Sequence, residues 1–266
     1  MALRLLVGAA LAALISWWAR RNGHLTGGGA VAALLVGTCA VAAGWFWAAA
    51  LLTFFTTSVA WTRAGAEGKR ARTEGMTGRT GARDPVQVFA NGGVFAVAAL
   101  ALAFSGGADT SAGVLPAIAL GALAAATADT WATEVGLLAR GLPRSILTGR
   151  PVDPGTSGGI TMAGTAAGCG GAALIGGGAA VAGHGALAAS AAFAGGVAGM
   201  LIDSVLGASL QTRRWCDACG AATERVTHTC GAPTRRVGGV SWLNNDGVNA
   251  LATVAGAATS LAVAAL

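Results

Sequence analysis

Eight long apolar segments alternate with short polar ones along the chain, and each is close to the length that a membrane helix needs. A helix that crosses the hydrocarbon core requires about 20 mainly apolar residues. The segments cover residues 2–19, 25–43, 45–61, 87–105, 113–139, 158–182, 186–211 and 246–265. The pattern predicts an all-α, polytopic integral membrane helical bundle of about eight spans, with residues 1–266 as a single transmembrane domain.

The first apolar segment has an alternative interpretation as a signal peptide, because it is short and rich in alanine. Its flank favours a membrane span. Trp17 and Trp18 are typical of the aromatic belt at a membrane surface, and Arg20 and Arg21 are typical of a cytoplasmic end. The prediction becomes seven spans if this segment is removed or if the fifth segment is broken differently.

Composition supports the membrane interpretation. Of the 266 residues, 54% are hydrophobic and only 11% are charged, whereas about a quarter of the residues in a soluble domain are charged. The 43 glycines also fit, because small residues let membrane helices approach closely. The sequence shows no motif for nucleic-acid binding, so no nucleic-acid partner is expected and the net charge of +6 needs another explanation.

The positions of the basic residues supply that explanation. All but Arg4 of the 17 lysines and arginines lie in alternate connections, namely residues 20–21, 63–83, 140–150 and 213–236. Because cytoplasmic loops carry the excess of Lys and Arg, we expect both termini outside and these basic loops in the cytoplasm. The high content of Ala, Gly and Arg indicates a bacterial source. The predicted location is therefore the bacterial inner membrane.

Six polar motifs all fall at the predicted cytoplasmic ends of the spans. They are "NGHLTGGG" (22–29), "RDPVQVFANGG" (83–93), "ADTWATEVG" (128–136), "PVDPGTSGGIT" (151–161), "DSVLGASLQ" (203–211) and "WLNNDGVN" (242–249). Polar residues with only structural roles would be scattered over both ends. Their segregation predicts one site that faces the cytoplasm.

Carboxylates within these motifs indicate a metal site. Asp129 and Glu134 lie inside an apolar span, where ionisable groups usually serve function. They are five residues apart, about 140° around a helix, so they converge on one ion only if the helix is locally unwound. Asp203 with Gln211, and Asn245 with Asn249 and Asp246, add further oxygen ligands of the kind that Mg²⁺ prefers. The predicted Mg²⁺ ligands are Asp129, Glu134, Asp203 and Asp246.

Phosphate-binding groups complement these carboxylates. In "PGTSGG" the glycines let backbone N–H groups approach a phosphate, and the following helix N-terminus favours an anion. Arg63, Lys69 and Arg83, with Arg70 and Arg79, are suited to binding further phosphate oxygens. Together these groups predict a phosphoryl-transfer site. Simpler alternatives are a proton or sodium site in a transporter for the carboxylates, a plain turn for "PGTSGG", and membrane anchoring for the arginines.

The connection 212–244 differs in kind from the other loops. It contains Cys216, Cys219, His228 and Cys230, and Cys₃His sites with a C-x₂-C half commonly bind zinc. Because the loop is predicted to be cytoplasmic, a disulfide framework is not expected. The sequence predicts a cytoplasmic Cys/His loop inserted between the last two spans, with a structural zinc site. The alternative is a polar loop with incidental thiols.

In their order along the chain, the motifs "QVFANGG", "ADTWATEVG", "PGTSGGIT", "DSVLGASLQ", the Cys/His pattern and "WLNNDGVN" resemble a known family. This is the integral-membrane family called transmembrane protein nineteen, or domain of unknown function ninety-two. Its characterised plant members look like phytyl-phosphate kinases. The resemblance implies Mg²⁺-dependent phosphoryl transfer from a nucleoside triphosphate, with CTP favoured, to an isoprenoid monophosphate such as phytyl or geranylgeranyl phosphate.

On this interpretation the candidate catalytic residues are Asp129, Glu134 and Asp203. The candidate substrate-binding residues are Arg63, Lys69, Arg83, Asn91, Gly155, Thr156, Ser157, Gly158, Gly159, Gln211, Asn244, Asn245 and Asn249. Two other functions stay open. An ion-coupled transporter would use the buried carboxylates, although the outer loops lack polar residues for a second opening. A CTP-dependent lipid nucleotidyltransferase would use the same metal and phosphate groups but release pyrophosphate.

Overall fold

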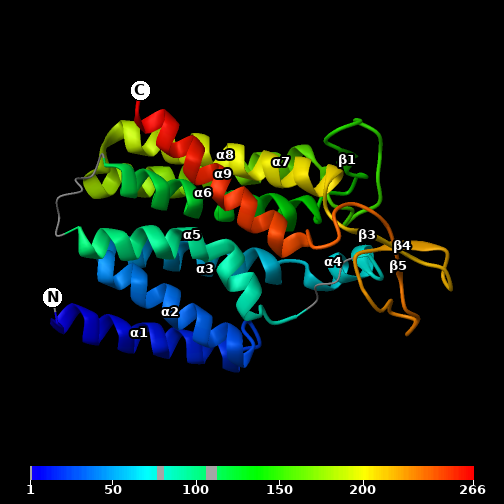
Figure 1. Cartoon of the computed structure of the whole chain (residues 1–266), viewed down its shortest axis with the longest axis horizontal. Coiled ribbons are helices and arrows are strands. Elements are labelled where there is room, and N and C mark those ends of the chain that lie inside the picture. Colours follow the sequence, from blue (N-terminus) through cyan, green and yellow to red (C-terminus); the bar gives the residue numbers. More distant parts are fainter. Residues whose placement is uncertain (1, 77–80, 106–112) are drawn as a thin grey trace.

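A computed structural model describes residues 2–76, 81–105 and 113–266. It confirms the predicted all-α membrane bundle. In Figure 1 both termini lie at one end of the long axis, and helix α4 and strands β3–β5 lie at the other end. The helices are α1 (Ala2–Arg21), α2 (Gly27–Ala43), α3 (Trp45–Arg63), α4 (Ala66–Thr73), α5 (Pro85–Phe104), α6 (Val114–Gly136), α7 (Met162–Ala179), η1 (Ala180–His184), α8 (Gly185–Ser209) and α9 (Asn245–Ala264).

Five helical stretches of the described chain are long and apolar enough to cross a membrane. One of them, Met162–Ser209, contains both α7 and α8. The chain reverses between these two helices at Gly183, whose φ is +88°. Helix α2, a shorter apolar helix, and the 19-residue α3 complete the set of long helices. These correspond to the eight predicted apolar segments, whereas the short polar helix α4 was not predicted.

Two local expectations are corrected. Helix α6 is continuous from Val114 to Gly136, so the local unwinding that Asp129 and Glu134 would need to converge on one ion is not present. The predicted sixth span begins later than residue 158, because Gly159–Ile160 forms strand β2 and helix α7 starts at Met162. The start of α7 is set by Thr161, whose hydroxyl accepts a hydrogen bond from the Gly164 amide.

The helices near the polar end begin at residues that cap them. Asp84 and Gln87 form a reciprocal capping box at the start of α5, with Pro85 in the first turn. Thr26 and Asn244 accept hydrogen bonds from amides in the first turns of α2 and α9, each at 3.0 Å. These caps satisfy amides that the helix itself leaves unpaired. The polar motifs therefore also determine where the helices start.

The core lies around α6, which packs against α5, α7, α8 and α9. From Ala119 to Ala128 every residue of α6 is buried. Glycines bring the backbones together here. A Cβ atom at Gly121 would lie 2.5 Å from the Gly256 carbonyl oxygen, and one at Gly195 would lie 2.4 Å from the same oxygen. This close crossing of α6, α8 and α9 is the packing that small residues permit in membranes.

The N-terminal helices pack less extensively. Helix α1 packs on α2, and α3 packs on α2 and α6, with little direct contact between α1 and α3. Large apolar side chains such as Leu3, Leu6 and Phe104 are mostly exposed, as expected for a surface that meets lipid. This looser arrangement leaves space beside α2.

Two small sheets lie at the polar end. Strand β1 (Arg144–Ser145) pairs antiparallel with β2 (Gly159–Ile160). Between α8 and α9 the order β4-β3-β5 forms a three-stranded antiparallel sheet. Its strands are β3 (Arg213–Cys216), β4 (Ala221–Thr223) and β5 (Arg235–Gly238).

Candidate functional site

A cavity of about 1400 Å³ joins an apolar region between the N-terminal helices to the polar end of the bundle. We call its two parts the apolar arm and the polar end. The apolar arm is lined by α1, α2 and α3 through residues that include Gly8, Leu11, Ile15, Val41, Trp45, Ala49, Leu52, Phe55 and Val59. The polar end includes Arg63, Lys69, Arg70, Arg83, Asn91, Asp129, Glu134, Asp203, Gln211, Asn244, Asn245, Asp246 and Asn249. The cavity is therefore amphipathic along its length.

Two loops that are distant in sequence meet at the polar end. The Thr26 amide donates to the Arg83 carbonyl oxygen at 3.0 Å, and the Arg83 amide donates to the His24 carbonyl oxygen at 2.9 Å. Close approach depends on glycine, because a Cβ atom at Gly29 would lie 2.2 Å from the Arg83 carbonyl oxygen. The glycines of "LTGGG" thus let the loop before α5 lie on the first turn of α2, which brings His24 and Arg83 to the same part of the cavity.

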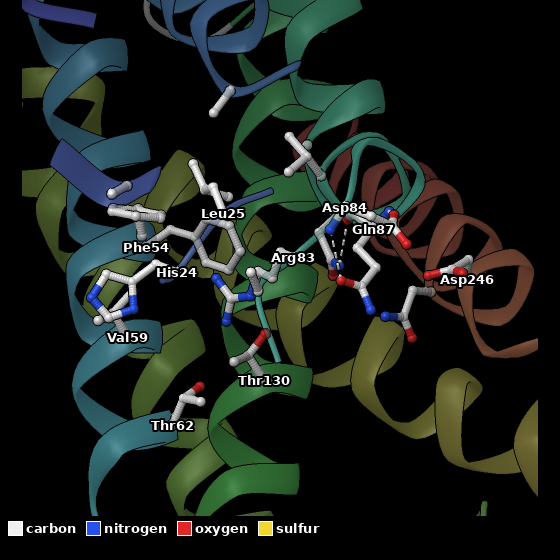
Figure 2. A pocket seen from close by; sticks show the side chains of 18 of the residues that line it. His24, Leu25, Phe54, Val59, Thr62, Arg83, Asp84, Gln87, Thr130 and Asp246 are labelled. Atoms are coloured by element: carbon white, nitrogen blue, oxygen red, sulfur yellow. Dashed lines mark hydrogen bonds between the residues drawn. The ribbon is translucent and has the colours of Figure 1, made fainter. Parts of the chain in front are cut away.

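Arg83 lies within this cavity and points toward Thr130 on α6 (Figure 2). Burial lowers the pKa of Arg83, while the negative charge of Glu134 raises it. Burial also lowers the pKa of His24, and the positive charges of Arg63 and Arg83 lower it further. Both effects on His24 favour the neutral imidazole.

Lys69 and Glu134 form a buried ion pair between α4 and α6. The Lys69 Nζ atom donates to Glu134 Oε2 at 2.5 Å and to the Trp61 carbonyl oxygen at 2.6 Å, and Thr62 donates to Glu134 Oε1 at 2.7 Å. Both carboxylate oxygens of Glu134 thus accept hydrogen bonds from the protein. Its predicted role as a metal ligand stays a prediction, because each oxygen keeps a second lone pair while the Lys69 charge already neutralises the carboxylate.

Acidic and amide side chains from the C-terminal helices line the other side of the polar end. Asp129 lies on α6, Asp203 on α8, and Asp246 and Asn249 on α9. With the Asn249 amide in its better-satisfied orientation, its nitrogen donates to Asp203 Oδ2 at 3.0 Å. Three separate helices thus contribute carboxylates to the lining of the polar end. Such hard oxygen ligands suit Mg²⁺.

The "PGTSGG" loop takes a different place from the other motifs, since its glycines do not line the cavity. Gly158 has φ +76°, and a Cβ atom there would lie 2.6 Å from the Ser204 carbonyl oxygen, so this loop packs tightly on α8. Ser157 donates to Glu224, which also accepts from Gln211 Nε2 at 2.8 Å. Glu224 lines the cavity. The loop therefore reaches the cavity only through Ser157 and Glu224, and its role as a phosphate cradle stays a prediction.

Some lining residues were not predicted. His24, Thr62 and Glu224 line the polar end but were not among the candidates. His24 lies within the motif "NGHLTGGG", which was a signal for it, whereas nothing near Glu224 in the sequence indicates the cavity. Among the basic residues, Arg72 donates to the Leu137, Ala139 and Gly141 carbonyl oxygens and so stabilises the C-terminus of α6. Arg79 lies outside the described residues.

The four Cys/His side chains of the 212–244 loop converge, as the spacing predicted. One ligand atom from each of Cys216, Cys219, His228 and Cys230 lies within 4.8 Å of all the others. The Cys216 and Cys230 sulfur atoms are 3.7 Å apart, too far for a disulfide, which requires about 2 Å. Zinc with bonds of about 2.3 Å to two thiolates in a tetrahedron would set their sulfur atoms about 3.8 Å apart. The cluster is therefore able to hold a metal ion.

The electrostatics of the cluster favour a thiolate. Hydrogen bonds from the Ala232 amide, from His228 and from Cys219 lower the pKa of Cys230 to about 6. The hydrogen bond with Cys230 and burial raise the pKa of Cys219 to about 11.

The end of β4 attaches the Cys/His loop to the N-terminal half. Thr223 donates to the Gly75 carbonyl oxygen at 2.6 Å, and the amide of the following residue, Glu224, donates to the Met76 carbonyl oxygen at 2.8 Å.

Comparison with known proteins gives three findings. The family model described as integral membrane protein DUF92 matches residues 10–257. The Protein PGR of Arabidopsis thaliana is 30% identical over 220 residues, which cover 75% of each chain. An uncharacterized membrane protein of Methanocaldococcus jannaschii is 36% identical over 163 residues, which cover 61% of this chain and 64% of that protein. No solved structure matches the chain.

Proposed function

This chain belongs to the DUF92 family of integral membrane proteins, and we propose that it catalyses Mg²⁺-dependent phosphoryl transfer from a nucleoside triphosphate to an isoprenoid monophosphate. CTP is the proposed donor, and phytyl or geranylgeranyl phosphate is the proposed acceptor, as the resemblance of the motifs implies. We place the site at the cytoplasmic edge of a bacterial inner membrane, where the basic loops would face the nucleotide pool.

The observation that carries the proposal is the amphipathic cavity. Its lining follows α3 from Trp45 to Thr62, a distance of about 25 Å at 1.5 Å per residue, and then reaches Arg63. An isoprenoid chain fits the apolar arm, and its phosphate then lies among arginines and carboxylates. A water-soluble substrate would not need the apolar arm.

For this phosphoryl transfer, the protein mainly has to position the two substrates and neutralise their charge. An oxygen of the acceptor phosphate forms a bond to the γ-phosphorus, and the bond from that phosphorus to the β–γ bridging oxygen breaks. The products are the prenyl diphosphate and the nucleoside diphosphate. The acceptor oxygen is already anionic at neutral pH, so no side chain has to remove a proton.

The side chains of the polar end fit these tasks. Bound Mg²⁺ would neutralise the phosphate charge that develops during transfer. Asp129, Asp203 and Asp246 would hold it, and Asn245 and Asn249 would add amide oxygens or orient the carboxylates. The guanidinium groups of Arg63 and Arg83 would bind phosphate oxygens. Lys69 is held by Glu134 at the edge of the same space.

The direct test is a reaction with purified protein, Mg²⁺, CTP and geranylgeranyl monophosphate, followed by mass spectrometry. We expect the prenyl diphosphate and CDP, and a loss of kcat on the order of a hundredfold in Asp203→Asn. Asp153→Asn is the matched control, because Asp153 is exposed and does not line the cavity. Pyrophosphate in place of CDP would identify a nucleotidyltransferase. Solute uptake by proteoliposomes without nucleotide would identify a transporter.

We also propose that the Cys/His cluster binds a structural Zn²⁺ ion. The four ligand atoms lie within 4.8 Å of one another, and four protein ligands complete a tetrahedron without a bound water. Zinc would hold β3 and the 228–230 turn together and so support Glu224 at the rim of the cavity.

A further inference from the structure

Charge is segregated within the polar end of the cavity. The N-terminal elements contribute a cationic wall, which we define as Arg63 at the end of α3 and Arg83 before α5. The C-terminal helices contribute a carboxylate wall, which we define as Asp129, Asp203, Asp246 and Asn249. Figure 2 shows Arg83 and Asp246 on separate sides of the space, with Asp84 and Gln87 between them.

The exceptions to this segregation have structural roles. Asp84 lies near the cationic wall, but its carboxylate caps α5 by accepting from the Gln87 amide. Glu134 accepts from Lys69 and Thr62, so the ion pair leaves little net charge at that position. Arg214 lines the opposite side, but its guanidinium donates to both oxygen atoms of Thr234. The arginines of the cationic wall differ, because their side chains have no hydrogen-bond or ion-pair partner among the described residues.

The apolar arm leads to the cationic wall. Along α3 the lining residues Leu52, Phe55 and Val59 precede Thr62 and Arg63 at intervals of three or four, so they form one stripe that ends at the arginine. Along α1 the lining stripe ends at Ala19, and the chain then turns through His24, which lies near Arg63 and Arg83. A chain lying in the apolar arm therefore presents its head group to the two arginines.

We infer that the two substrates bind on opposite walls: the lipid phosphate on Arg63 and Arg83 of the cationic wall, and the metal–nucleotide on the carboxylate wall. This inference rests on the proposed function. The γ-phosphoryl group passes from the carboxylate wall to the cationic wall, forming one P–O bond to the lipid phosphate and breaking one to the nucleoside diphosphate. The two walls thus provide different specificity, one for a lipid monophosphate and the other for a divalent cation.

Binding measurements without turnover test this assignment. Geranylgeranyl monophosphate binding is measured in the absence of metal and nucleotide, and Mn²⁺ binding is measured by electron paramagnetic resonance in the absence of lipid. We expect Arg63→Gln and Arg83→Gln each to weaken prenyl phosphate binding about tenfold and to leave Mn²⁺ binding unchanged. We expect Asp203→Asn and Asp246→Asn to weaken Mn²⁺ binding and to leave prenyl phosphate binding unchanged. Arg140→Gln, at an exposed arginine outside the cavity, is the matched control.

Two additional probes separate binding from folding. Geranylgeraniol lacks the phosphate, so its binding should be the same in wild type and in Arg63→Gln. Arg83→Lys keeps the positive charge and should restore most of the prenyl phosphate affinity that Arg83→Gln loses. Equal loss of both ligands in every variant, or unchanged lipid phosphate binding in both Arg→Gln variants, overturns the assignment. If the binding pattern holds and no prenyl diphosphate forms, the two-wall assignment stands and the proposed kinase function fails.

Discussion

The two halves of the bundle pack in opposite ways. In the C-terminal half, Gly121, Gly195 and Gly256 bring α6, α8 and α9 so close that no side chain fits between their backbones. In the N-terminal half, α1 and α3 both pack on α2 but make little contact with each other, and a cavity runs between them. The difference in helix spacing accompanies a difference in composition, because α3 contains six Trp and Phe residues and no glycine, whereas α8 contains five glycines.

This contrast matches what each half would hold under the proposed function. Carboxylates at the membrane edge need a rigid frame that keeps their oxygens at fixed positions, and close-packed helices provide one. An isoprenoid chain needs an apolar space that is open to the bilayer and tolerant of shape. The rigid half carries the proposed metal–nucleotide wall, and the loosely packed half carries the apolar arm.

The largest effect should come from filling the glycine crossing. Gly121→Leu would place side-chain atoms against the backbone of α9, where Ser260 Cβ and the Gly256 carbonyl oxygen already lie within 2.5 Å of an added Cβ. Backbone cannot move aside as a flexible side chain can, so we expect loss of the folded protein in detergent, monitored by size-exclusion chromatography. Gly177→Leu on α7 is the matched control, because an added Cβ there meets nothing within 4 Å. A monodisperse Gly121→Leu protein with unchanged Tm would contradict the rigid-core interpretation.

The next effect should come from the ion pair that joins the two halves. Lys69→Met leaves Glu134 without its charge partner in a mostly buried position, and we expect a loss of about 3 kcal/mol in the free energy of unfolding. Adding Glu134→Gln removes the unpaired charge and should restore part of that loss. Chemical unfolding in detergent measures both, with Arg70→Met on the exposed side of α4 as the control. Additive effects of the two substitutions would argue against direct coupling.

A more local effect is expected at the Cys/His loop, which attaches the C-terminal half to α4. Wild-type protein should carry about one zinc ion per chain, and Cys216→Ser should lose it, as measured by elemental analysis. The bundle itself should stay folded, because its core does not include this loop. Cys169→Ser in α7 is the control and should retain zinc. Full zinc occupancy in Cys216→Ser would show that the cluster is not the metal site.

The smallest effect should be a change in KM that depends on the chain length of the acceptor. Ala49→Phe adds a ring to the lining of the apolar arm, so we expect KM for geranylgeranyl phosphate to rise about tenfold with little change in kcat. A short acceptor such as dimethylallyl phosphate should be unaffected. Thr56→Phe, an exposed position of α3 outside the lining, is the control. An equal change for both acceptors would mean that the arm does not hold the chain.

Particular residues show how far the sequence predicted the site. Asp129, Asp203, Asp246 and Asn249 were identified because charged or amide groups stand out in apolar helices, and the cavity brings them together. Glu134 was identified for the same reason. Its pairing with Lys69, 65 residues away, could not be predicted, because it depends on how the short helix α4 folds back on α6.

Glu224 was missed for a related reason. It lies in a polar loop where a carboxylate is ordinary, and only the fold of the Cys/His loop brings it to Ser157 and Gln211. The "PGTSGG" loop shows the converse. Its glycines resemble a phosphate cradle, but Gly158 packs on α8 and the loop does not line the cavity. The same glycine pattern allows the close approach of either a phosphate or a neighbouring helix.

The sequence by itself determined that the chain is a helical membrane protein and that its polar motifs gather at one end. Span length, apolar composition and the distribution of arginines are local properties that the bilayer selects directly. Only the tertiary structure decided which basic side chains form ion pairs and which line a cavity. It also decided that the apolar arm leads to Arg63 and Arg83. These features arise from contacts between residues far apart in the sequence, such as Lys69 with Glu134 and Gly29 with the Arg83 backbone.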